Sequence, residues 1–350
     1  MSRRVLFTLT AATMAGLLIG TVWLGKDAHR LLVPYDDGYN ERCDGHARDN
    51  STERQIPEAT AFLSRRDPQR DAFFFVETSC LGNVNARQAC AVESAARLHP
   101  EADVYLLLLS PAAALNLSAN PSVQVLLEHY INVHVLYVHL EDYFRDSLLE
   151  KWYQIGTLRA SQYQQSHTSD AFRFFTLWKY GGTYLDLDIV LIKSLKGLRN
   201  FAGAESNLDI AAGVLNFEPA QNNLALECVL EIRDNFRGDD WGSNGPGVIT
   251  RVLQRRCATR RVNLMNRERC DGFLVMPPYA FYPVTWKKWK LYFDEAHSDL
   301  TMRSLNQSYG IHVWNKFSIT KQVRVGSKQP YGLVAQQFCP RVYDSSGKIF

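Results

Sequence analysis

The stretch GGTYLDLDIVL, residues 181–191, constrains the fold more than any other part of this sequence. Two glycines follow a helical pattern and precede an apolar, strand-like run, expected over 184–192, that carries Asp186 and Asp188. Burying a charge without a partner is expensive, so these carboxylates need either a ligand or an exposed strand end. Open α/β sheets bind ligands at the carboxyl ends of their strands. The stretch therefore predicts an α/β fold with Asp186 and Asp188 at its binding edge.

The helix before the two glycines is expected over 168–180. Thr168 or Ser169 would suit its N-terminus, because a side-chain oxygen there accepts a hydrogen bond from a free backbone N–H group. Glycine takes up the left-handed conformation that commonly ends a helix. Gly181 is therefore expected to stop this helix, and Gly182 to let the backbone run close to a neighbour.

Three apolar runs further upstream have the character of buried strands, being short and rich in β-branched or aromatic residues. They cover 72–77, 104–109 and 133–140, and residues 86–98 between the first two are small or apolar at helical spacing. Strand, helix and strand in this order predict a right-handed parallel βαβ unit.

The N-terminal residues predict a membrane anchor. Residues 5–24 carry no charge, and a helix of this length, rising about 1.5 Å per residue, spans a hydrocarbon core of about 30 Å. A cleaved signal peptide is the alternative, although its apolar core is usually only about 7–15 residues. Arg3 and Arg4 favour a cytosolic N-terminus. We therefore expect a cytosolic tail (1–4), a transmembrane signal anchor (5–24), a stem (25–70) and a lumenal domain (71–345).

The seven cysteines show no CxxC spacing, which argues against a zinc or thioredoxin-type site. Their proximity in sequence suggests the pairs Cys80–Cys90 and Cys257–Cys270. Together with the anchor and the N-x-S/T sequons at Asn50, Asn116 and Asn306, they indicate an oxidising, lumenal compartment. A formal net charge of +3 without any long basic run excludes nucleic acid as an expected partner.

Asp-x-Asp at a strand end leaves several kinds of chemistry open. Two carboxylates two residues apart point to the same face of an ideal strand and suit a hard divalent cation such as Mn²⁺ or Mg²⁺. The same letters fit a haloacid-dehalogenase-type phosphatase, in which the first aspartate is a nucleophile, with Asp239-Asp240 as a downstream acidic pair. That signature normally opens its domain, whereas more than a hundred folded-looking residues precede it here. A binding protein without turnover is the third alternative.

The wider context resembles a known family. The pattern S-D-x-x-R-x(7)-G-G-x-Y-x-D-x-D runs from Ser169 to Asp188, and FFVETS, GPGVITRVL, AFYPVTWKKWKLYF and HVWNK occur around it. From about residue 72 to about residue 340, these motifs in this order resemble the animal α1,4-glycosyltransferase family, which shares a DXD sugar-transferase core.

The resemblance implies a GT-A fold, in which a Rossmann-like nucleotide-sugar-binding half is fused to an acceptor-binding half. It implies a Golgi type II membrane enzyme that uses Mn²⁺ and a UDP-sugar. Such an enzyme would transfer galactose or N-acetylgalactosamine in α1,4 linkage, with retention, to a glycosphingolipid such as lactosylceramide. N-acetylglucosamine as the donor sugar and other glycolipids or glycoproteins as acceptors remain alternatives. So does a homodimer or a complex with other Golgi transferases.

The donor sugar is open because this sequence departs from the family pattern. Members that use UDP-galactose often carry Asp-Thr-Asp, followed in the next strand by a segment such as Asn-Gly-Ala-Phe. Here the motif is Asp-Leu-Asp, and the corresponding strand reads DIAAGVLN over 209–216. A donor bulkier at C2 than galactose is therefore compatible with residues 211–213.

The resemblance also assigns roles. Asp188 would be the principal metal ligand, Asp186 would contact the ribose and the metal or a metal-bound water, and His312 would be a third ligand. Asp170 and Arg173, one helical turn apart, would bind donor-sugar hydroxyls. The resemblance also implies other candidates: Tyr184 at the donor, Thr78 and Ser79 at the uridine, Trp314 against the diphosphate or sugar, Lys316 near the leaving group, Gly245 and Pro246 in a loop near the reacting sugar, and Phe281, Tyr282, Trp286 and Trp289 against the acceptor. No nucleophile is evident, so we expect same-face attack assisted by the leaving phosphate.

Overall fold

The structure is a computed structural model that describes Cys43 and residues 56–109, 120–219 and 222–350. The predicted tail and anchor lie outside the described residues, as do most of the stem and the sequons at Asn50 and Asn116. No helix within the described ranges combines the length and the apolar character needed to cross a membrane.

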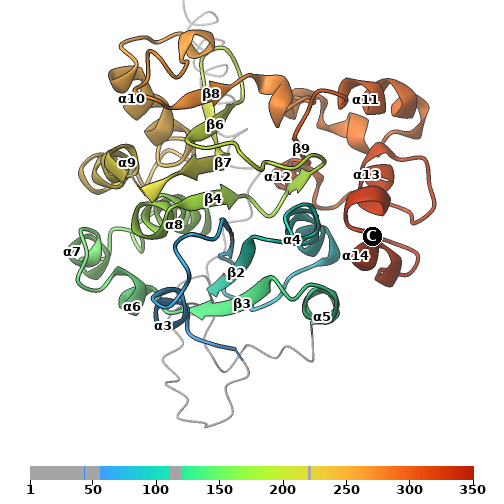
Figure 1. Cartoon of the computed structure of the whole chain (residues 1–350), viewed down its shortest axis with the longest axis horizontal. Coiled ribbons are helices and arrows are strands. Elements are labelled where there is room, and N and C mark those ends of the chain that lie inside the picture. Colours follow the sequence, from blue (N-terminus) through green and yellow to red (C-terminus); the bar gives the residue numbers. More distant parts are fainter. Residues whose placement is uncertain (1–42, 44–55, 110–119, 220–221) are drawn as a thin grey trace, which may run out of the picture. The chain divides into compact units, whose positions relative to one another are not determined.

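Seven strands of the described residues form one mixed sheet (Figure 1). They are β1 (Ala72–Glu77), β2 (Asp103–Leu109), β3 (Val133–Val138), β4 (Gly182–Leu185), β6 (Phe201–Ala204), β7 (Ile210–Phe217) and β8 (Leu274–Met276). Their order is β3-β2-β1-β4-β7-β6-β8. Strands β3, β2, β1 and β4 are mutually parallel, β7 runs antiparallel to β4 and β6, and β8 is parallel to β6. The fold is thus a parallel α/β half joined to a mixed half.

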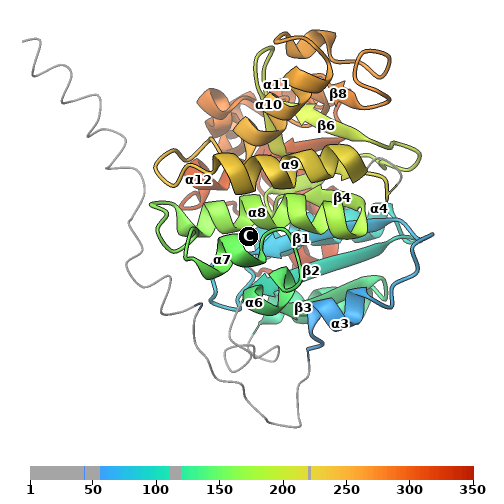
Figure 2. The ribbon, with the colours of Figure 1, turned by 90° about the vertical axis from the view of Figure 1, so that its left-hand side faces the viewer.

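Helices cover both faces of this sheet. The α-helices of the described chain are α3 (Ala59–Leu63), α4 (Ala86–Leu98), α5 (Pro121–His129), α6 (Leu140–Phe144), α7 (Glu150–Gln154), α8 (Gln164–Tyr180), α9 (Asn222–Asn235), α10 (Pro246–Arg256), α11 (Ser298–Ser304), α12 (Asn315–Ser318), α13 (Pro330–Phe338) and α14 (Pro340–Ser345). Figure 2 shows α8 and α9 side by side along one face.

Strand β1 shows why the strands are apolar along their whole length. Its residues Phe74 and Val76 enter the core shared with α8 and α9, whereas Phe73 and Phe75 enter the core shared with α4. Successive strand residues point to opposite faces, and a sheet covered on both sides needs apolar residues at every position.

The predicted βαβ unit is confirmed in its elements and its parallel pairing. Strand β1 and helix α4 have the predicted bounds, β2 begins one residue earlier at Asp103, and β3 ends two residues earlier at Val138. The Asn85 side chain caps α4 by accepting a hydrogen bond from the Gln88 backbone N–H group, and the Gln88 side chain accepts one from the Asn85 backbone N–H group.

Helix α8 begins earlier than predicted. It starts at Gln164 without a side-chain cap, so the capping role of Thr168 or Ser169 is wrong. Its end is as predicted: Gly181 has a φ of +64° and follows the last helical residue. At Gly182 a β-carbon would lie 2.7 Å from the Ala72 carbonyl oxygen, so glycine permits the close approach of β4 to β1.

The single strand predicted over 184–192 is wrong. The chain leaves β4 after Leu185 and forms a separate strand β5 (Ile189–Leu191), which pairs antiparallel with β9 (Gly310–His312). Between them the Asp186 carbonyl accepts a hydrogen bond from the Ile189 N–H group at 2.9 Å, which closes a turn. The carboxylates of Asp186 and Asp188 therefore lie on a turn between two sheets and not on one face of a strand.

The disulfide Cys257–Cys270 is confirmed, but the pair Cys80–Cys90 is wrong. Cys80 is bonded to Cys43 and Cys90 to Cys339. The two predicted partners lie on opposite sides of the sheet, since Cys80 belongs to the core under α8 and Cys90 to the core under α4. Cys228 is a buried free cysteine.

Candidate active site

Three predicted metal ligands meet at the edge of the sheet. Asp186, Asp188 and His312 each offer one ligand atom, and these atoms all lie within 4.8 Å of one another. The small sheet explains the convergence, because Ile189 of β5 is paired with His312 of β9. The backbone pairing of β5 with β9 thus brings Asp188 to His312, although the two residues lie far apart in the sequence.

Asp188 is bonded through both of its oxygens. Its Oδ1 lies 3.1 Å from His312 Nε2, and its Oδ2 accepts a hydrogen bond of 2.8 Å from the backbone N–H group of Asn315, the first residue of α12. Burial would raise the pKa of Asp188, but His312 and the Asn315 N–H group hold it below its usual value. For His312, burial would lower the pKa, and the charge of Asp188 raises it.

These residues fit a divalent cation. Two carboxylates and an imidazole form a mixed oxygen and nitrogen set that suits Mn²⁺ and related ions. The side chains of Asp188 and His312 are each only 13% exposed. Within the described residues, the buried Nδ1 atom of His312 has no hydrogen-bond partner. A divalent cation would give the buried Asp188 carboxylate a positive partner.

Asp186 has one oxygen fixed by the protein. Its Oδ1 accepts a hydrogen bond of 2.8 Å from the Tyr184 hydroxyl and lies 3.1 Å from Arg173 Nη1. The Arg173 guanidinium lies 4.7 Å from the centre of the Tyr184 ring and donates a second bond, of 2.9 Å, to the Ala212 carbonyl oxygen of β7. These contacts leave Oδ2 as the oxygen available to a ligand.

Asp170 is buried beside the same arginine. Its Oδ1 lies 3.2 Å from Arg173 Nη2. Burial raises the pKa of Asp170 to about 7, with Arg173 opposing the rise and Asp186 adding to it. A β-carbon on Gly245 would lie 2.2 Å from Asp170 Oδ1, so only glycine fits there unless the carboxylate moves. Pro246 follows as the first residue of α10, a favoured position for proline.

Thr78 lies directly after β1, at the same edge of the sheet as Asp186, because β1 and β4 are parallel. Its hydroxyl donates to the Gln165 carbonyl oxygen at 3.1 Å. Trp314 is 8% exposed, donates its indole N–H to the Val284 carbonyl oxygen at 2.8 Å, and packs edge-on against His312 at 4.0 Å. In this position Trp314 supports the His312 ring.

The remaining candidates separate into core and surface. Phe281 and Tyr282 are buried, whereas Trp286 is 43% exposed and stacks on Phe317 at 5.8 Å. The Lys316 ammonium lies 3.4 Å from the centre of the Trp241 ring. Sequence reasoning treated Tyr282 only as a stacking group and gave no role to its hydroxyl, which lies close to Asp186.

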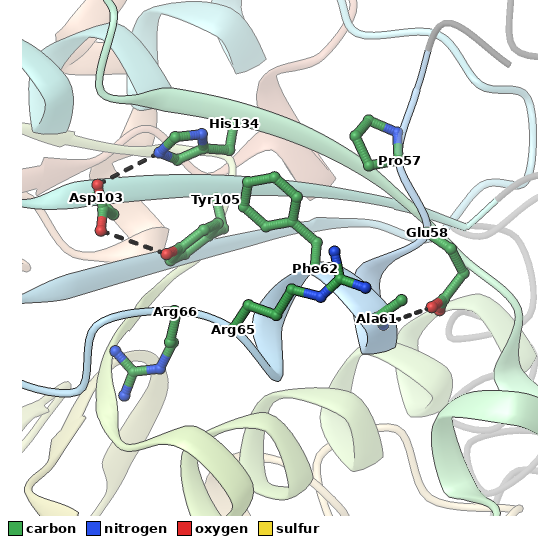
Figure 3. A pocket seen from close by; sticks show the side chains of 9 residues that line it. All are labelled: Pro57, Glu58, Ala61, Phe62, Arg65, Arg66, Asp103, Tyr105 and His134. Atoms are coloured by element: carbon green, nitrogen blue, oxygen red, sulfur yellow. Dashed lines mark hydrogen bonds and ion pairs between the residues drawn. The ribbon is translucent and has the colours of Figure 1, made fainter.

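A separate hollow of about 390 Å³ lies elsewhere and is shown in Figure 3. It is lined by residues of α3, β2 and β3. Asp103 contacts His134 and Tyr105 there at 3.3 Å and 3.4 Å, and Glu58 accepts a hydrogen bond from the Ala61 N–H group. Asp103 is the first residue of β2, whereas Asp186 follows the last residue of β4. Since these strands point the same way, Asp103 lies at the opposite end of the sheet from Asp186, and none of the residues that line the hollow is a candidate residue of this site.

Known proteins are similar to this chain over most of its length. Residues 85–208 match a family model described as a glycosyltransferase sugar-binding region containing a DXD motif, and residues 218–346 match an alpha 1,4-glycosyltransferase conserved region. The chain is 35% identical over 279 residues to the Homo sapiens protein named lactosylceramide 4-alpha-galactosyltransferase, covering 79% of this chain and 78% of that protein. The chain belongs to the alpha 1,4-glycosyltransferase family.

Two further relatives show the breadth of this alpha 1,4-glycosyltransferase family. The Mus musculus protein named lactosylceramide 4-alpha-galactosyltransferase is 35% identical, over 77% of this chain and 74% of its own length. The Homo sapiens alpha-1,4-N-acetylglucosaminyltransferase is 26% identical, over 78% of this chain and 80% of its own length. The solved structure of PaToxG glycosyltransferase has a TM-score of 0.41 and 12% identity, covering 80% of this chain and 89% of that one.

Membership of the alpha 1,4-glycosyltransferase family makes this chain a glycosyltransferase. The matched DXD region contains Asp186 and Asp188 and implies a divalent metal and a nucleotide-sugar donor. It decides against the phosphatase alternative.

Proposed function

We propose that this protein is a retaining hexosyltransferase. It would transfer galactose from UDP-galactose, in α1,4 linkage, to the terminal sugar of a glycosphingolipid such as lactosylceramide. The observation that carries the proposal is the cluster of Asp186, Asp188 and His312 in a chain 35% identical to proteins named for that reaction. Mn²⁺ is the proposed metal, because it accepts both oxygen and imidazole ligands; when bound, it would neutralise charge on the departing diphosphate.

Different residues of the chain would contact different parts of the donor. Asp188, Asp186 and His312 would hold the cation, and α12 would fix Asp188 through the Asn315 N–H group. Asp170, Arg173 and Tyr184 would shape the sugar-binding side of the site, because they form one connected network with Asp186. Thr78 would lie on the uridine side, Gly245 and Pro246 in the loop near the sugar, and Trp314 behind His312.

Retention is proposed to follow from same-face attack. The acceptor hydroxyl oxygen would form the new bond to the anomeric carbon as the bond to the phosphate oxygen breaks, and the hydroxyl proton would pass to the departing phosphate. The two aspartates nearest the sugar side are poorly suited to be nucleophiles. Asp170 is buried against Arg173, and Asp186 Oδ1 is held by two donors. A covalent sugar adduct trapped on any side chain would contradict this step.

The donor alternative is N-acetylgalactosamine or N-acetylglucosamine. The β7 segment nearest Asp186 is formed by Ala211, Ala212 and Gly213. These residues are small, and one of the relatives is named for N-acetylglucosamine transfer. A glycoprotein acceptor belongs with this second candidate.

A Golgi lumenal location with a type II anchor at 5–24 is part of the proposal. Three disulfides among the described residues support an oxidising compartment. Asn306, the sequon residue within the described chain, is exposed and therefore accessible to glycosylation.

The test uses the full chain in detergent micelles with Mn²⁺ and lactosylceramide. UDP-galactose, UDP-N-acetylgalactosamine, UDP-N-acetylglucosamine and UDP-glucose are supplied one at a time, and UDP release and glycolipid product are measured. We expect turnover with UDP-galactose that falls at least about 100-fold in Asp188→Ala, since even groups that only support a metal ligand are worth about 10- to 100-fold. Asp299→Ala, which removes an exposed carboxylate on α11, is the matched control. Turnover only with another donor would support the second candidate, and no turnover with any donor would refute the proposal.

A further inference from the structure

One buried hydroxyl at the site has no partner. Tyr282 is 2% exposed, and its hydroxyl oxygen makes no hydrogen bond within the described part of the chain. Leaving a buried polar group unsatisfied costs about 1–3 kcal/mol. Such a group in a native structure calls for an explanation, and a bound ligand is one.

The position of this hydroxyl is set by tight packing. A β-carbon on Gly203 of β6 would lie 2.9 Å from Tyr282 Cε2, and one on Gly213 of β7 would lie 3.2 Å from the Tyr282 hydroxyl oxygen. The ring therefore lies across two glycines on neighbouring strands. On its other side, the rings of His312 and Trp314 are centred 5.5 Å and 5.9 Å away. With so many contacts, the ring has little freedom to seek another partner.

The hydroxyl faces the free side of Asp186. The same β-carbon position on Gly213 that lies 3.2 Å from the Tyr282 hydroxyl lies 2.7 Å from Asp186 Oδ2. Glu205, directly after β6, is half-buried, and its charge acts on both Tyr282 and His312. A tyrosine hydroxyl carries its proton at neutral pH, because its ordinary pKa is about 10. The hydroxyl thus keeps its proton and is a hydrogen-bond donor.

We propose that Tyr282 binds the donor substrate and that its hydroxyl donates a hydrogen bond to a hydroxyl group of the sugar being transferred. A phosphate oxygen is the less suitable acceptor, because Asp186 and Glu205 would repel its charge. A sugar hydroxyl is neutral and can accept from Tyr282 while it donates to one of these carboxylates. This inference rests on the proposed function and adds a specificity-determining residue to it.

The experiment compares Tyr282→Phe with the wild-type full chain in micelles. Phenylalanine keeps the ring that fills the space over Gly203 and Gly213, so the fold is preserved. The donor is the UDP-sugar that the wild type turns over, together with analogues that each lack one sugar hydroxyl. We expect kcat/KM for the intact donor to fall about 10-fold, while the Kd of UDP alone in Mn²⁺ stays within about twofold. For one deoxy donor, kcat/KM with the wild type should be about 10-fold lower than for the intact donor. Tyr282→Phe should show no further loss with that analogue, because the same hydrogen bond is already missing.

Tyr292→Phe is the matched control. Tyr292 is another fully buried tyrosine, and the carboxylates of the site are not among the causes that shift its pKa. This variant should leave both measurements unchanged. If Tyr282→Phe weakened the binding of UDP alone as much as it lowered kcat/KM, the inference would be overturned and the hydroxyl would be assigned to the diphosphate or the metal. An unchanged kcat/KM, or equal losses for every deoxy donor in both proteins, would overturn it in favour of a purely structural role. If the wild type turns over no UDP-sugar, the proposed function fails, and this inference fails with it.

Discussion

At the scale of single residues, the two oxygens of Asp186 have different surroundings. Oδ1 is held by Tyr184 and Arg173, whereas Oδ2 faces Gly213 and the Tyr282 hydroxyl. A carboxylate fixed at one oxygen cannot rotate freely, so the other is already aimed before a ligand arrives. Such preorganisation lowers the cost of ordering the site on binding.

Gly213→Ala tests this arrangement. The new β-carbon would lie 2.7 Å from Asp186 Oδ2, closer than real β-carbon contacts come, and Oδ1 is bound too firmly for the carboxylate to move cheaply. We expect kcat/KM to fall at least about 10-fold while the folded structure remains, because a misplacement of about 1 Å can cost as much as 100-fold. Gly242→Ala is the matched control, since no atom lies within 4 Å of its β-carbon position. Equal activity of the two variants would show that the Asp186 carboxylate adapts.

At the scale of elements, α4 is linked through α12 to Asp188, one of the proposed metal ligands. Arg87 of α4 donates hydrogen bonds to the Ser318 carbonyl oxygen at 2.8 Å and to the Asn315 side chain at 2.6 Å, and Asn315 in turn donates its backbone N–H to Asp188. The guanidinium also packs over the Phe293 and Tyr331 rings at 5.4 Å and 5.3 Å. One arginine thus fixes the short helix that orients Asp188.

Arg87→Met should therefore affect both stability and metal binding. It leaves buried oxygens of α12 without donors, so we expect the free energy of unfolding to fall by about 2–4 kcal/mol. Mn²⁺ should also bind about 10-fold more weakly, as for other residues that support a ligand. Urea unfolding and a Mn²⁺ titration with UDP present measure the two effects. Arg97→Met, on an exposed position of the same helix, should change neither; a loss of stability without any change in Mn²⁺ affinity would separate α12 from the metal site.

Local sequence signals were sufficient for some elements. The continuous apolar run of β1 and the helical spacing of small and apolar residues in α4 are each local, so β1 and α4 could be predicted to the residue. The break between β4 and β5 could not, since it depends on β7 and β9 as pairing partners far along the chain. The placement of the Tyr282 hydroxyl depends on glycines of two other strands for the same reason. His312 was found only because the sequence resembles a family.

At the scale of the whole molecule, the disulfide Cys90–Cys339 closes the longest covalent loop and links α4 to the junction of α13 and α14. Cys90 and Cys339 are 249 residues apart, whereas Cys257 and Cys270 are 13 apart. Glu93, one turn after Cys90, accepts hydrogen bonds of 2.9 Å and 2.8 Å from the backbone N–H groups of Arg341 and Val342 in α14. The contact between α4 and α14 is therefore made twice, once by the disulfide and once by a carboxylate at a helix N-terminus.

Removing each disulfide by paired Cys→Ala changes should rank them by loop length. In the chain-entropy view, the Cys90–Cys339 bond should stabilise the fold by about 2–3 kcal/mol more than the Cys257–Cys270 bond. Thermal unfolding under non-reducing conditions should show the larger fall in Tm for Cys90→Ala/Cys339→Ala. The reverse order would mean that strain or residual denatured structure outweighs loop entropy.

The distance between Cys90 and Cys339 also has a consequence for biosynthesis. A ribosome that has added Cys90 has 249 residues still to add, the last of them Cys339, before the disulfide can form. Until Cys339 has been added, the thiol of Cys90 cannot form its native bond, so this covalent link between α4 and the last helices can form only when nearly the whole chain has been made. A polypeptide truncated before Cys339 lacks the partner of Cys90 and cannot form this link at all.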